Sequence, residues 1–317
     1  MAGTEIRNQT SVQEFILLGF PGTWYFQMFL IVVFSVMYVL TIVGNMSIIA
    51  LVRTHPCLHT PMYFFLCNLS FLEIWYTTAC VPKAIGIMLG TSQTISFTVC
   101  LLQLFFLLSM GSTECFLLAV MAYDRYLAIC HPLRYTVMTG RVCTQLAAGS
   151  WACGFLIPMI TVFVMSYLTF CGPNEINHFF CDFKPLVKLS CTDSYSVETT
   201  VCIFSSAVTL VPFLLILVSY THILRAILKI PSTTGRKKAF STCSSHLIVV
   251  TTFYGTLIVM YVAPSANDSP ALNKVFSLLY TTVTPMFNPI IYSLRNQEVR
   301  ERLNAPLAFF PHTSSLP

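Results

Sequence analysis

Long stretches without charged residues most limit what this chain can fold into. A bilayer core needs about 20 apolar residues in helical form. Only helices and closed barrels satisfy backbone hydrogen bonds within lipid, and the runs lack the short alternating pattern of membrane β-strands. The sequence therefore predicts an all-α membrane protein, a bundle of seven transmembrane helices. Runs with no charge, or with one Glu, cover residues 26–52, 60–82, 84–123, 142–165, 199–224, 239–263 and 275–294.

Composition excludes two other classes of protein. The chain of 317 residues is 56% hydrophobic and 9% charged, whereas an ordinary globular domain has about 25% charged residues. A surface that faces water cannot be covered by so few charged residues. Most of the surface of this protein is therefore expected to face lipid. Lys and Arg exceed Asp and Glu only by 17 to 12 and are dispersed, which excludes a basic nucleic-acid-binding stripe.

The placement of Lys and Arg predicts the orientation, because cytoplasmic loops are enriched in them. With the N-terminus outside, twelve of the 17 cations fall in 53–59, 125–141, 225–238 and the tail from 295. We expect an extracellular tail (1–25), a membrane domain (26–294) and a cytoplasmic tail (295–317) with a short amphipathic helix. Residues 1–25 lack the pattern of a cleavable signal peptide, so the first span is expected to act as an uncleaved anchor. The predicted spans are 26–52, 60–82, 96–124, 142–165, 199–224, 239–263 and 272–294.

Cysteines and a glycosylation motif agree with this orientation. Four of the 13 cysteines fall on the predicted outer side, namely Cys100, Cys171, Cys181 and Cys191. An even number in an oxidising compartment predicts two disulfides, and the spacing leaves all three pairings open. Asn8 begins an Asn-Gln-Thr acceptor in the outer tail and is predicted to be glycosylated. Asn267 begins a second acceptor in a short loop, where modification is left open.

Four polar residues lie at similar depths within predicted spans. They are Asn45, Glu73, Glu114 and Asn288. A charged side chain inside a membrane costs roughly 2.5–3.5 kcal/mol even on a lenient scale, so each is a functional hypothesis. The cluster either holds a cation or exchanges protons with water, or it is a hydrogen-bonded network of neutral carboxyl groups. We expect Pro212, Pro285 and Pro289 to bend their helices, since each removes a backbone hydrogen bond.

Residues 121–135, MAYDRYLAICHPLRY, place an acid and a base side by side at the end of an apolar run. A cation here is either an interfacial anchor or part of an ionic latch, by which we mean an ion pair that holds a helix end in one of two arrangements. His178, Cys181 and Asp182 offer an imidazole, a thiolate and a carboxylate on one loop, which are possible metal ligands. A metal site there is disfavoured because a disulfide would remove the Cys181 thiolate.

Motifs throughout the chain resemble those of rhodopsin-like (class A) G-protein-coupled receptors. The general features are Gly44-Asn45, Asp124-Arg125-Tyr126, Trp151, Pro212 with Tyr220, and Asn288-Pro289-Ile290-Ile291-Tyr292. A sharper set is similar to olfactory (odorant) receptors of the tetrapod (class II) branch. That set comprises Pro61-Met62-Tyr63-Phe64-Phe65-Leu66, Met121-Ala122-Tyr123-Asp124-Arg125-Tyr126-Leu127-Ala128-Ile129-Cys130, Ser219-Tyr220, Lys238-Ala239-Phe240-Ser241-Thr242-Cys243-Ser244-Ser245-His246-Leu247 and Pro285-Met286-Phe287-Asn288-Pro289.

This resemblance implies a partner, a disulfide pattern and a cation site. It pairs Cys100 with Cys181, and Cys171 with Cys191. It implies a sodium ion near Glu73 and Glu114, and coupling to a stimulatory, olfactory-type G protein that raises cAMP. A plasma-membrane location, in olfactory cilia, is expected. The residues implied in activation are Asp124, Arg125, Tyr126, Tyr220, Asn288, Pro289 and Tyr292.

The sequence also departs from many class A receptors. Phe253-Tyr254-Gly255-Thr256 stands where a Trp-containing switch motif often lies, so Tyr254 is the candidate switch. The outer half of the third predicted span has no acid, which argues against a salt bridge to an amine ligand. The tail from residue 295 has no cysteine, so the palmitoyl anchor that is common in class A is not expected here.

A ligand pocket between helices should be mostly apolar with a few polar groups. Gly111 lies on one face of the third predicted span, where the missing side chain leaves room for a ligand. We expect a small, neutral, largely apolar ligand with one hydrogen-bonding group, although each residue alone has plain helix packing as its alternative. The predicted contacts are Leu104, Leu107, Leu108, Gly111, Ser112, Phe204, Ser205, Val208, Tyr254, Leu257, Ile258, Tyr261, Leu278 and Thr281.

Together these observations favour an odorant receptor that is not an enzyme, with Asp124 and Arg125 forming a latch. A cation- or proton-coupled transporter is the first rival, but the halves of the chain show no repeat. An intramembrane enzyme would need paired catalytic groups within a span, and His246 alone does not provide them. A receptor for an endogenous metabolite outside the nose is a rival within the receptor class.

Overall fold

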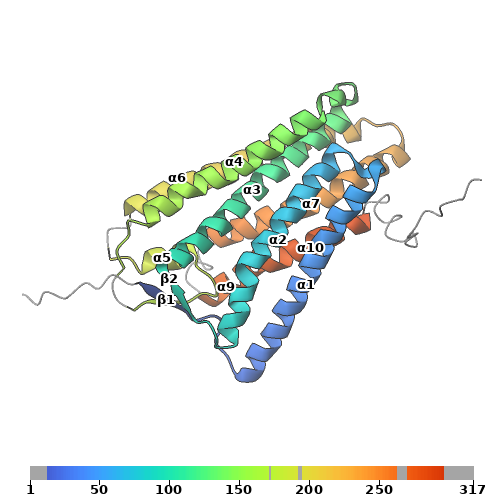
Figure 1. Ribbon diagram of the computed structural model, residues 1–317. Coiled ribbons are helices and arrows are strands. Elements are labelled where there is room, and N and C mark those ends of the chain that lie inside the picture. Colours follow the sequence, from blue (N-terminus) through green and yellow to red (C-terminus); the bar gives the residue numbers. More distant parts are fainter. Residues whose placement is uncertain (1–12, 171–172, 192–194, 263–269, 296–317) are drawn as a thin grey trace, which may run out of the picture.

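The computed structural model describes residues 13–170, 173–191, 195–262 and 270–295 (Figure 1). Within these ranges, five helices are long and apolar enough to cross a membrane. Each covers one of the first five predicted spans, which supports a membrane protein built from helices. The five are α1 (Trp24–Thr54), α2 (Pro61–Met88), α3 (Phe97–Cys130), α4 (Gly140–Met165) and α6 (Tyr195–Leu228).

The last two predicted spans are also helical, but with an interruption. The helix α7 (Thr233–Val262) covers the sixth predicted span within the described residues. The seventh is divided into α9 (Pro270–Leu278), a π-helical turn η3 (Leu279–Val283) and α10 (Thr284–Arg295). Pro285 is the second residue after the π-turn, and a proline has no N–H to continue the ordinary helical pattern. The expected distortion of this span therefore appears as a π-turn.

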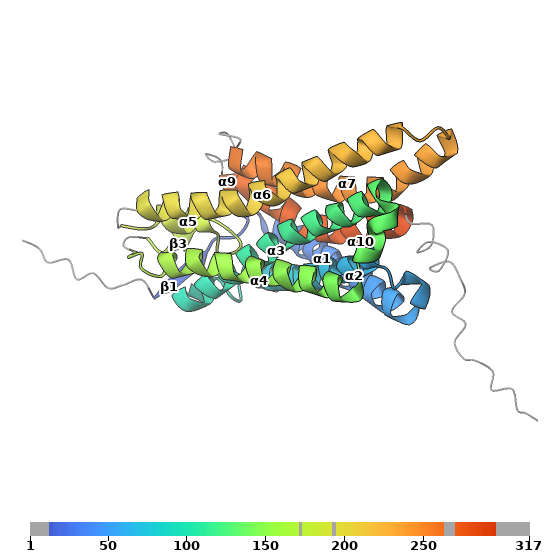
Figure 2. The same ribbon diagram turned by 90° about the horizontal axis from the view of Figure 1, so that it is seen from above.

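Helix α3 forms the centre of the bundle. It packs against α2, α4, α6 and α7, while α1 packs against α2 and α10. Seen from above, α6 and α7 run along one side of the bundle and α4 along another (Figure 2). The close approach of α3 and α4 depends on Gly154, because a Cβ at this position would lie 2.8 Å from the backbone N and Cα of Thr113.

Several helices extend beyond the spans that the charges predicted. The third span was expected to end at residue 124, yet α3 continues to Cys130 and includes Arg125. Likewise, α6 continues to Leu228 and α7 begins at Thr233. Charged residues mark where a helix leaves lipid, but the helical hydrogen bonds continue into water until a break. In α3 that break is His131-Pro132, followed by the 3-10 helix η2 (Pro132–Val137).

A small β-sheet covers one end of the bundle, which we call the sheet end. The strand β1 (Glu14–Leu17) lies between β2 (Thr94–Ser96), to which it is antiparallel, and β3 (Glu175–Ile176), to which it is parallel. Phe15 and Leu17 of β1 are fully buried. Beside the sheet lies the short helix α5 (Phe183–Lys188) (Figure 1). The α6–α7 turn lies at the opposite end.

Candidate functional site

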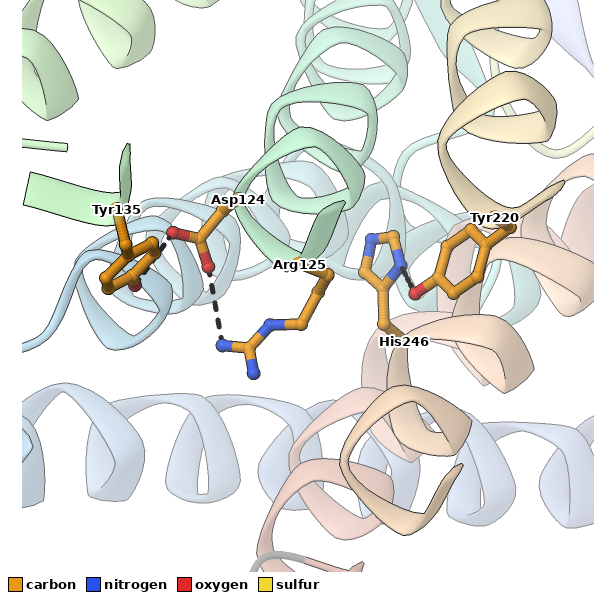
Figure 3. Close-up of polar contacts among 5 residues, drawn as sticks. All are labelled: Asp124, Arg125, Tyr135, Tyr220 and His246. Carbon is orange, nitrogen blue, oxygen red and sulfur yellow. Dashed lines mark hydrogen bonds and ion pairs between the residues drawn. The ribbon is translucent and has the colours of Figure 1, made fainter. Parts of the chain in front are cut away.

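An ion pair joins the two charged residues near the C-terminal end of α3. Arg125 Nη2 lies 3.4 Å from Asp124 Oδ2. The other carboxylate oxygen, Asp124 Oδ1, accepts a hydrogen bond of 3.1 Å from the hydroxyl of Tyr135 in η2. Asp124 is fully buried and the Arg125 side chain is 13% exposed. Figure 3 shows the carboxylate of Asp124 between Tyr135 and Arg125, so the acid is held from two sides.

A second polar contact joins α6 to α7 at the same end of the bundle. The hydroxyl of Tyr220 lies 2.7 Å from Nδ1 of His246, and the two rings stack at an angle of 16°. Arg125 lies between this pair and Asp124 in Figure 3. Tyr126, which follows Arg125, contacts His131 through its hydroxyl at 2.9 Å. These contacts tie α3, η2, α6 and α7 together around Arg125.

The four polar residues predicted to form a cluster are all buried. Asn288 of α10 donates a hydrogen bond to Glu73 Oε1 of α2. Asn45 of α1 donates to the carbonyl oxygens of Thr41 and Pro285, at 3.0 and 3.3 Å. Glu114 of α3 is close enough to Glu73 for an electrostatic interaction. The helices α1, α2, α3 and α10 thus contribute to one polar region within the membrane domain.

Three oxygens in this region lack a hydrogen-bond donor. They are Asn45 Oδ1, Glu73 Oε2 and Asn288 Oδ1, each buried and unpartnered within the described part of the chain. Buried oxygens normally accept a hydrogen bond or coordinate a cation. A hard monovalent cation would satisfy such an oxygen-only set. Next to it, Pro289 packs against Gly44 of α1, and Tyr292 is 4% exposed.

The predicted ligand contacts differ in how the bundle surrounds them. Leu104, Leu107, Val208, Tyr254 and Thr281 are buried, and Leu108, Gly111, Ser112, Phe204, Leu257 and Leu278 are partly buried. Ser205 and Ile258 are exposed, so the bundle does not enclose them. The side chain of Tyr261 lies outside the described set. The structure therefore brings most, but not all, of the predicted set into the bundle interior.

Two of these positions have properties that suit a ligand contact. A methyl group at Gly111 would meet no atom within 4 Å, so there is open space beside α3 at this point. The hydroxyl of Tyr254 is buried and has no oxygen or nitrogen partner among the described residues. Its ring packs 4.7 Å from that of Phe213. The Cys115 thiol is a weak partner for this hydroxyl, so the hydroxyl is the kind of buried group that can bind one polar atom of a ligand.

A disulfide anchors the sheet end to the top of α3. Cys100 is bonded to Cys181, with Cα atoms 5.5 Å apart, as the family resemblance predicted. Gln103 strengthens the connection, since its side chain accepts from Cys181 N–H at 3.0 Å and donates to the Ala79 carbonyl at 2.9 Å. Cys191 is also disulfide-bonded. Its predicted partner Cys171 and the acceptors Asn8 and Asn267 lie outside the described residues.

A buried lysine ties three separate segments together beneath the sheet. Lys274 of α9 is 3% exposed. It donates to the Gly19 carbonyl and, at 2.6 Å, to Asn177 Oδ1. Its ammonium also lies 5.9 Å from the centre of the Phe20 ring, within range of a cation–π contact. The segment after β1, the loop after β3 and α9 are thereby joined into one lid.

His178 adds a pH-sensitive contact to this lid. Its Nδ1 accepts from Phe180 N–H at 3.4 Å, so the neutral ring carries its proton on Nε2 and donates to Ser277 Oγ at 3.2 Å. Burial and the nearby Lys274 cation lower the pKa of His178 from 6.5 to about 3. The metal site considered for His178, Cys181 and Asp182 does not fit this arrangement, because Cys181 is in a disulfide.

Acidification is expected to destabilise the lid through His178. Between pH 6.5 and about 3, the unfolded chain binds a proton at His178 and the folded chain does not. The free energy of unfolding therefore falls with decreasing pH, by about 2 kcal/mol at pH 5. Melting temperatures of the purified receptor between pH 7.5 and pH 5 measure this, and His178→Asn should flatten the slope. An unchanged slope in the variant would contradict the assignment.

Tyr135 and His246 are functional candidates that sequence reasoning missed. Tyr135 lies in an irregular loop, where no periodicity indicates that its hydroxyl turns back to Asp124. His246 was set aside as a single histidine, but it meets Tyr220 only because α6 and α7 pack side by side. Asp124 and Tyr135 are eleven residues apart, and this spacing matches no sequence motif that predicts a contact. Both contacts are products of tertiary structure.

Comparisons with known proteins agree on one family. The family model described as olfactory receptor matches residues 34–308. Olfactory receptor 6F1 of Homo sapiens is 55% identical over 93% of this chain and 96% of its own length. Olfactory receptor 226 of Rattus norvegicus is 51% identical, covering 96% and 94%, and olfactory receptor 6A2 of Homo sapiens is 50% identical, covering 97% and 96%. With its membrane-spanning helices and the motifs on them, the chain belongs to the olfactory receptor family.

Proposed function

We propose that this olfactory receptor binds small volatile, mostly apolar ligands within its helix bundle and activates a stimulatory, olfactory-type G protein. Activation would raise cAMP at the plasma membrane, in olfactory neuron cilia. The observation that carries the proposal is the Asp124–Arg125 ion pair, with Tyr220–His246 beside it. A paired arginine next to a movable helix can be released when a ligand favours a second arrangement.

The proposal includes a seven-span topology with the N-terminus outside and the C-terminus inside. Residues 1–25 form the outer tail, 26–294 the membrane domain and 295–317 the cytoplasmic tail. The Cys100–Cys181 disulfide supports this orientation, because disulfides persist in oxidising compartments. The sheet end is then extracellular, and the Asp124–Arg125 pair faces the cytoplasm.

In the proposed mechanism, ligand contacts near Gly111 and Tyr254 act on α7. Tyr254 belongs to α7, which also carries His246. A ligand shifts the balance between two arrangements of α7 only by binding one of them more tightly than the other. A ligand that prefers the arrangement in which the cytoplasmic half of α7 lies further outward therefore favours that arrangement. The Tyr220–His246 contact then rearranges, and Arg125 and Tyr220 become available to the G protein.

A screen of volatile compounds against cells expressing the receptor tests the proposal. The readout is cAMP, with the same cells lacking the receptor as the control. A response to volatiles that requires the receptor is the expected result. A response only to water-soluble metabolites would favour the alternative function, that of a receptor for an endogenous metabolite. A response through a pathway other than cAMP would contradict the proposed G protein.

The Tyr254 hydroxyl gives a clean test of the ligand site. Since its hydroxyl has only the Cys115 thiol, a weak partner, among the described residues, Tyr254→Phe should change the stability of the folded receptor little. Loss of one ligand hydrogen bond of about 1 kcal/mol should lower potency roughly five-fold. Ser112→Ala should act in the same direction. Dose–response curves at matched surface expression measure the effect, and unchanged potency in both variants would rule out this pocket.

A sodium ion at Glu73 and Glu114 is part of the proposal. The three unpartnered oxygens of Asn45, Glu73 and Asn288 support it, because they need a positive partner. The residues that would hold the ion are Glu73, Asn45 and Asn288, with the Glu114 carboxyl nearby. A higher melting temperature in sodium than in choline chloride is expected, and Glu73→Gln should remove the difference. Equal melting temperatures for the unmodified receptor in both salts would exclude the ion.

A further inference from the structure

A groove lies between the C-terminal end of α6 and the first turns of α7, and none of the sites above uses it. Its volume is about 540 Å³, and residues from the last two turns of α6 and the first turns of α7 line it. Figure 2 shows this pair of helices extending beyond their neighbours at the end opposite the sheet. In the proposed orientation, on which this inference rests, the groove lies at the cytoplasmic surface of the membrane.

One wall of the groove is apolar and faces away from the bundle. Leu224, Leu228 and Phe240 are 51%, 64% and 53% exposed. Ile227, in contrast, is 5% exposed and packs with Cys243 and Ile223 toward α3. Large apolar side chains that face outward near a membrane surface contact lipid tails. The open side of the groove is therefore the lipid side.

The other wall is cationic. Arg236 and Lys237 line it, together with Ser241. Arg236 Nε is buried and has no hydrogen-bond partner within the described residues, so one guanidinium donor is shielded from water and unsatisfied. The sequence has no Asp or Glu between Glu198 and Asp268, so no acid on this hairpin neutralises the two cations. An anion with oxygen acceptors would satisfy the buried donor and balance both cations, and hydrogen bonds between charged partners are the strong ones.

We propose that the groove binds an anionic phospholipid of the cytoplasmic leaflet. The phosphate lies against Arg236 and Lys237, and an acyl chain follows Leu224, Leu228 and Phe240. Both halves of the site fit this occupant, since basic pockets between transmembrane helices on the cytoplasmic side bind anionic head groups. A soluble phosphate would leave the apolar wall unused. By touching both helices, the lipid links the ends of α6 and α7.

Native mass spectrometry of the full-length receptor in mild detergent tests the site. The probes are dioleoyl phosphatidylserine and, as the neutral comparison, dioleoyl phosphatidylcholine. We expect selective binding of phosphatidylserine, weakened about ten-fold or more in Arg236→Gln/Lys237→Gln. The matched control is Arg225→Gln/Lys229→Gln, which removes the same charge from the same hairpin but outside the groove. It should change the affinity less than about two-fold.

Two further measurements distinguish a lipid site from a site for a soluble phosphate and from diffuse attraction by charge. Soluble glycerophosphoserine should not compete, because it lacks the acyl chain, and Phe240→Ser should weaken lipid binding although both cations remain. Equal losses in the two charge variants would indicate diffuse attraction and overturn the site. Competition by glycerophosphoserine at the same concentration as the lipid would overturn the lipid assignment. Antibody access to a C-terminal epitope in intact cells tests the orientation separately, so a failure of the lipid site is distinguishable from a failure of the topology.

Discussion

Replacing Arg125 with alanine is expected to abolish the odorant-evoked rise in cAMP in receptor that still reaches the cell surface. The Arg125 side chain is 13% exposed and is paired with a fully buried carboxylate. In the proposed active arrangement this guanidinium contacts the G protein, and the methyl side chain of alanine cannot make that contact. The measurement is cAMP per receptor at the surface, because removing one partner of a buried pair also costs stability.

Three further variants separate a latch from a merely structural ion pair. Asp124→Asn and Tyr135→Phe each weaken the restraint on Arg125 while keeping the arginine, so basal cAMP should rise in both. Arg141→Ala removes an exposed cation from the same end of the bundle and should change nothing. Intact odorant signalling in Arg125→Ala, or unchanged basal activity in both of the releasing variants, would contradict the latch.

Gly154→Ala is expected to prevent most of the receptor from reaching the cell surface. The new methyl group would lie 2.0 Å from Thr113 Oγ1 and 2.8 Å from the backbone of Thr113. A side-chain atom can rotate away, but the backbone of α3 can yield only if α3 and α4 separate. Overpacking of this kind costs about 1–3 kcal/mol and sometimes more. Surface immunolabelling and the melting temperature of the purified receptor measure the loss.

Gly149→Ala provides the matched control on the same helix. A Cβ at Gly149 would meet no atom within 4 Å, and alanine favours a helix over glycine by up to about 1 kcal/mol. This variant should therefore express as well as the unmodified receptor or better. If Gly154→Ala and Gly149→Ala behave alike, the close packing of α3 on α4 does not limit folding.

The membrane helices were predictable because charge placement depends on the lipid. A charge inside a bilayer is costly whatever the tertiary structure, so gaps between charges locate the spans. Helix ends obey a different rule, which is why α3 passes Arg125 and continues to Cys130. Pro285 was correctly expected to disturb its helix, but the form of the disturbance, a π-turn, depends on packing against α1 and α2.

The candidate site was predictable only in part. Asp124 and Arg125 are adjacent in sequence, so their pairing could be expected from the chain itself. The contact of Tyr220 with His246 spans 26 residues and depends on how α6 and α7 pack. The sheet was not predicted at all, since strands of two to four residues are too short to leave an alternating pattern. Its parallel pair joins Ile16 to Glu175, far apart in the sequence.

The lid at the sheet end has a consequence for the timing of the response. Lys274, β1 and the Cys100–Cys181 disulfide join several segments at the sheet end, which in the proposed orientation lies between the extracellular water and the proposed ligand site. In that arrangement an odorant would wait for a local opening of the lid or pass between helices from the lipid. Since binding that requires a conformational change is slower than diffusional encounter, the onset rate should level off at high odorant concentration. The protein, rather than the arrival of odorant molecules, would then set how fast the signal begins.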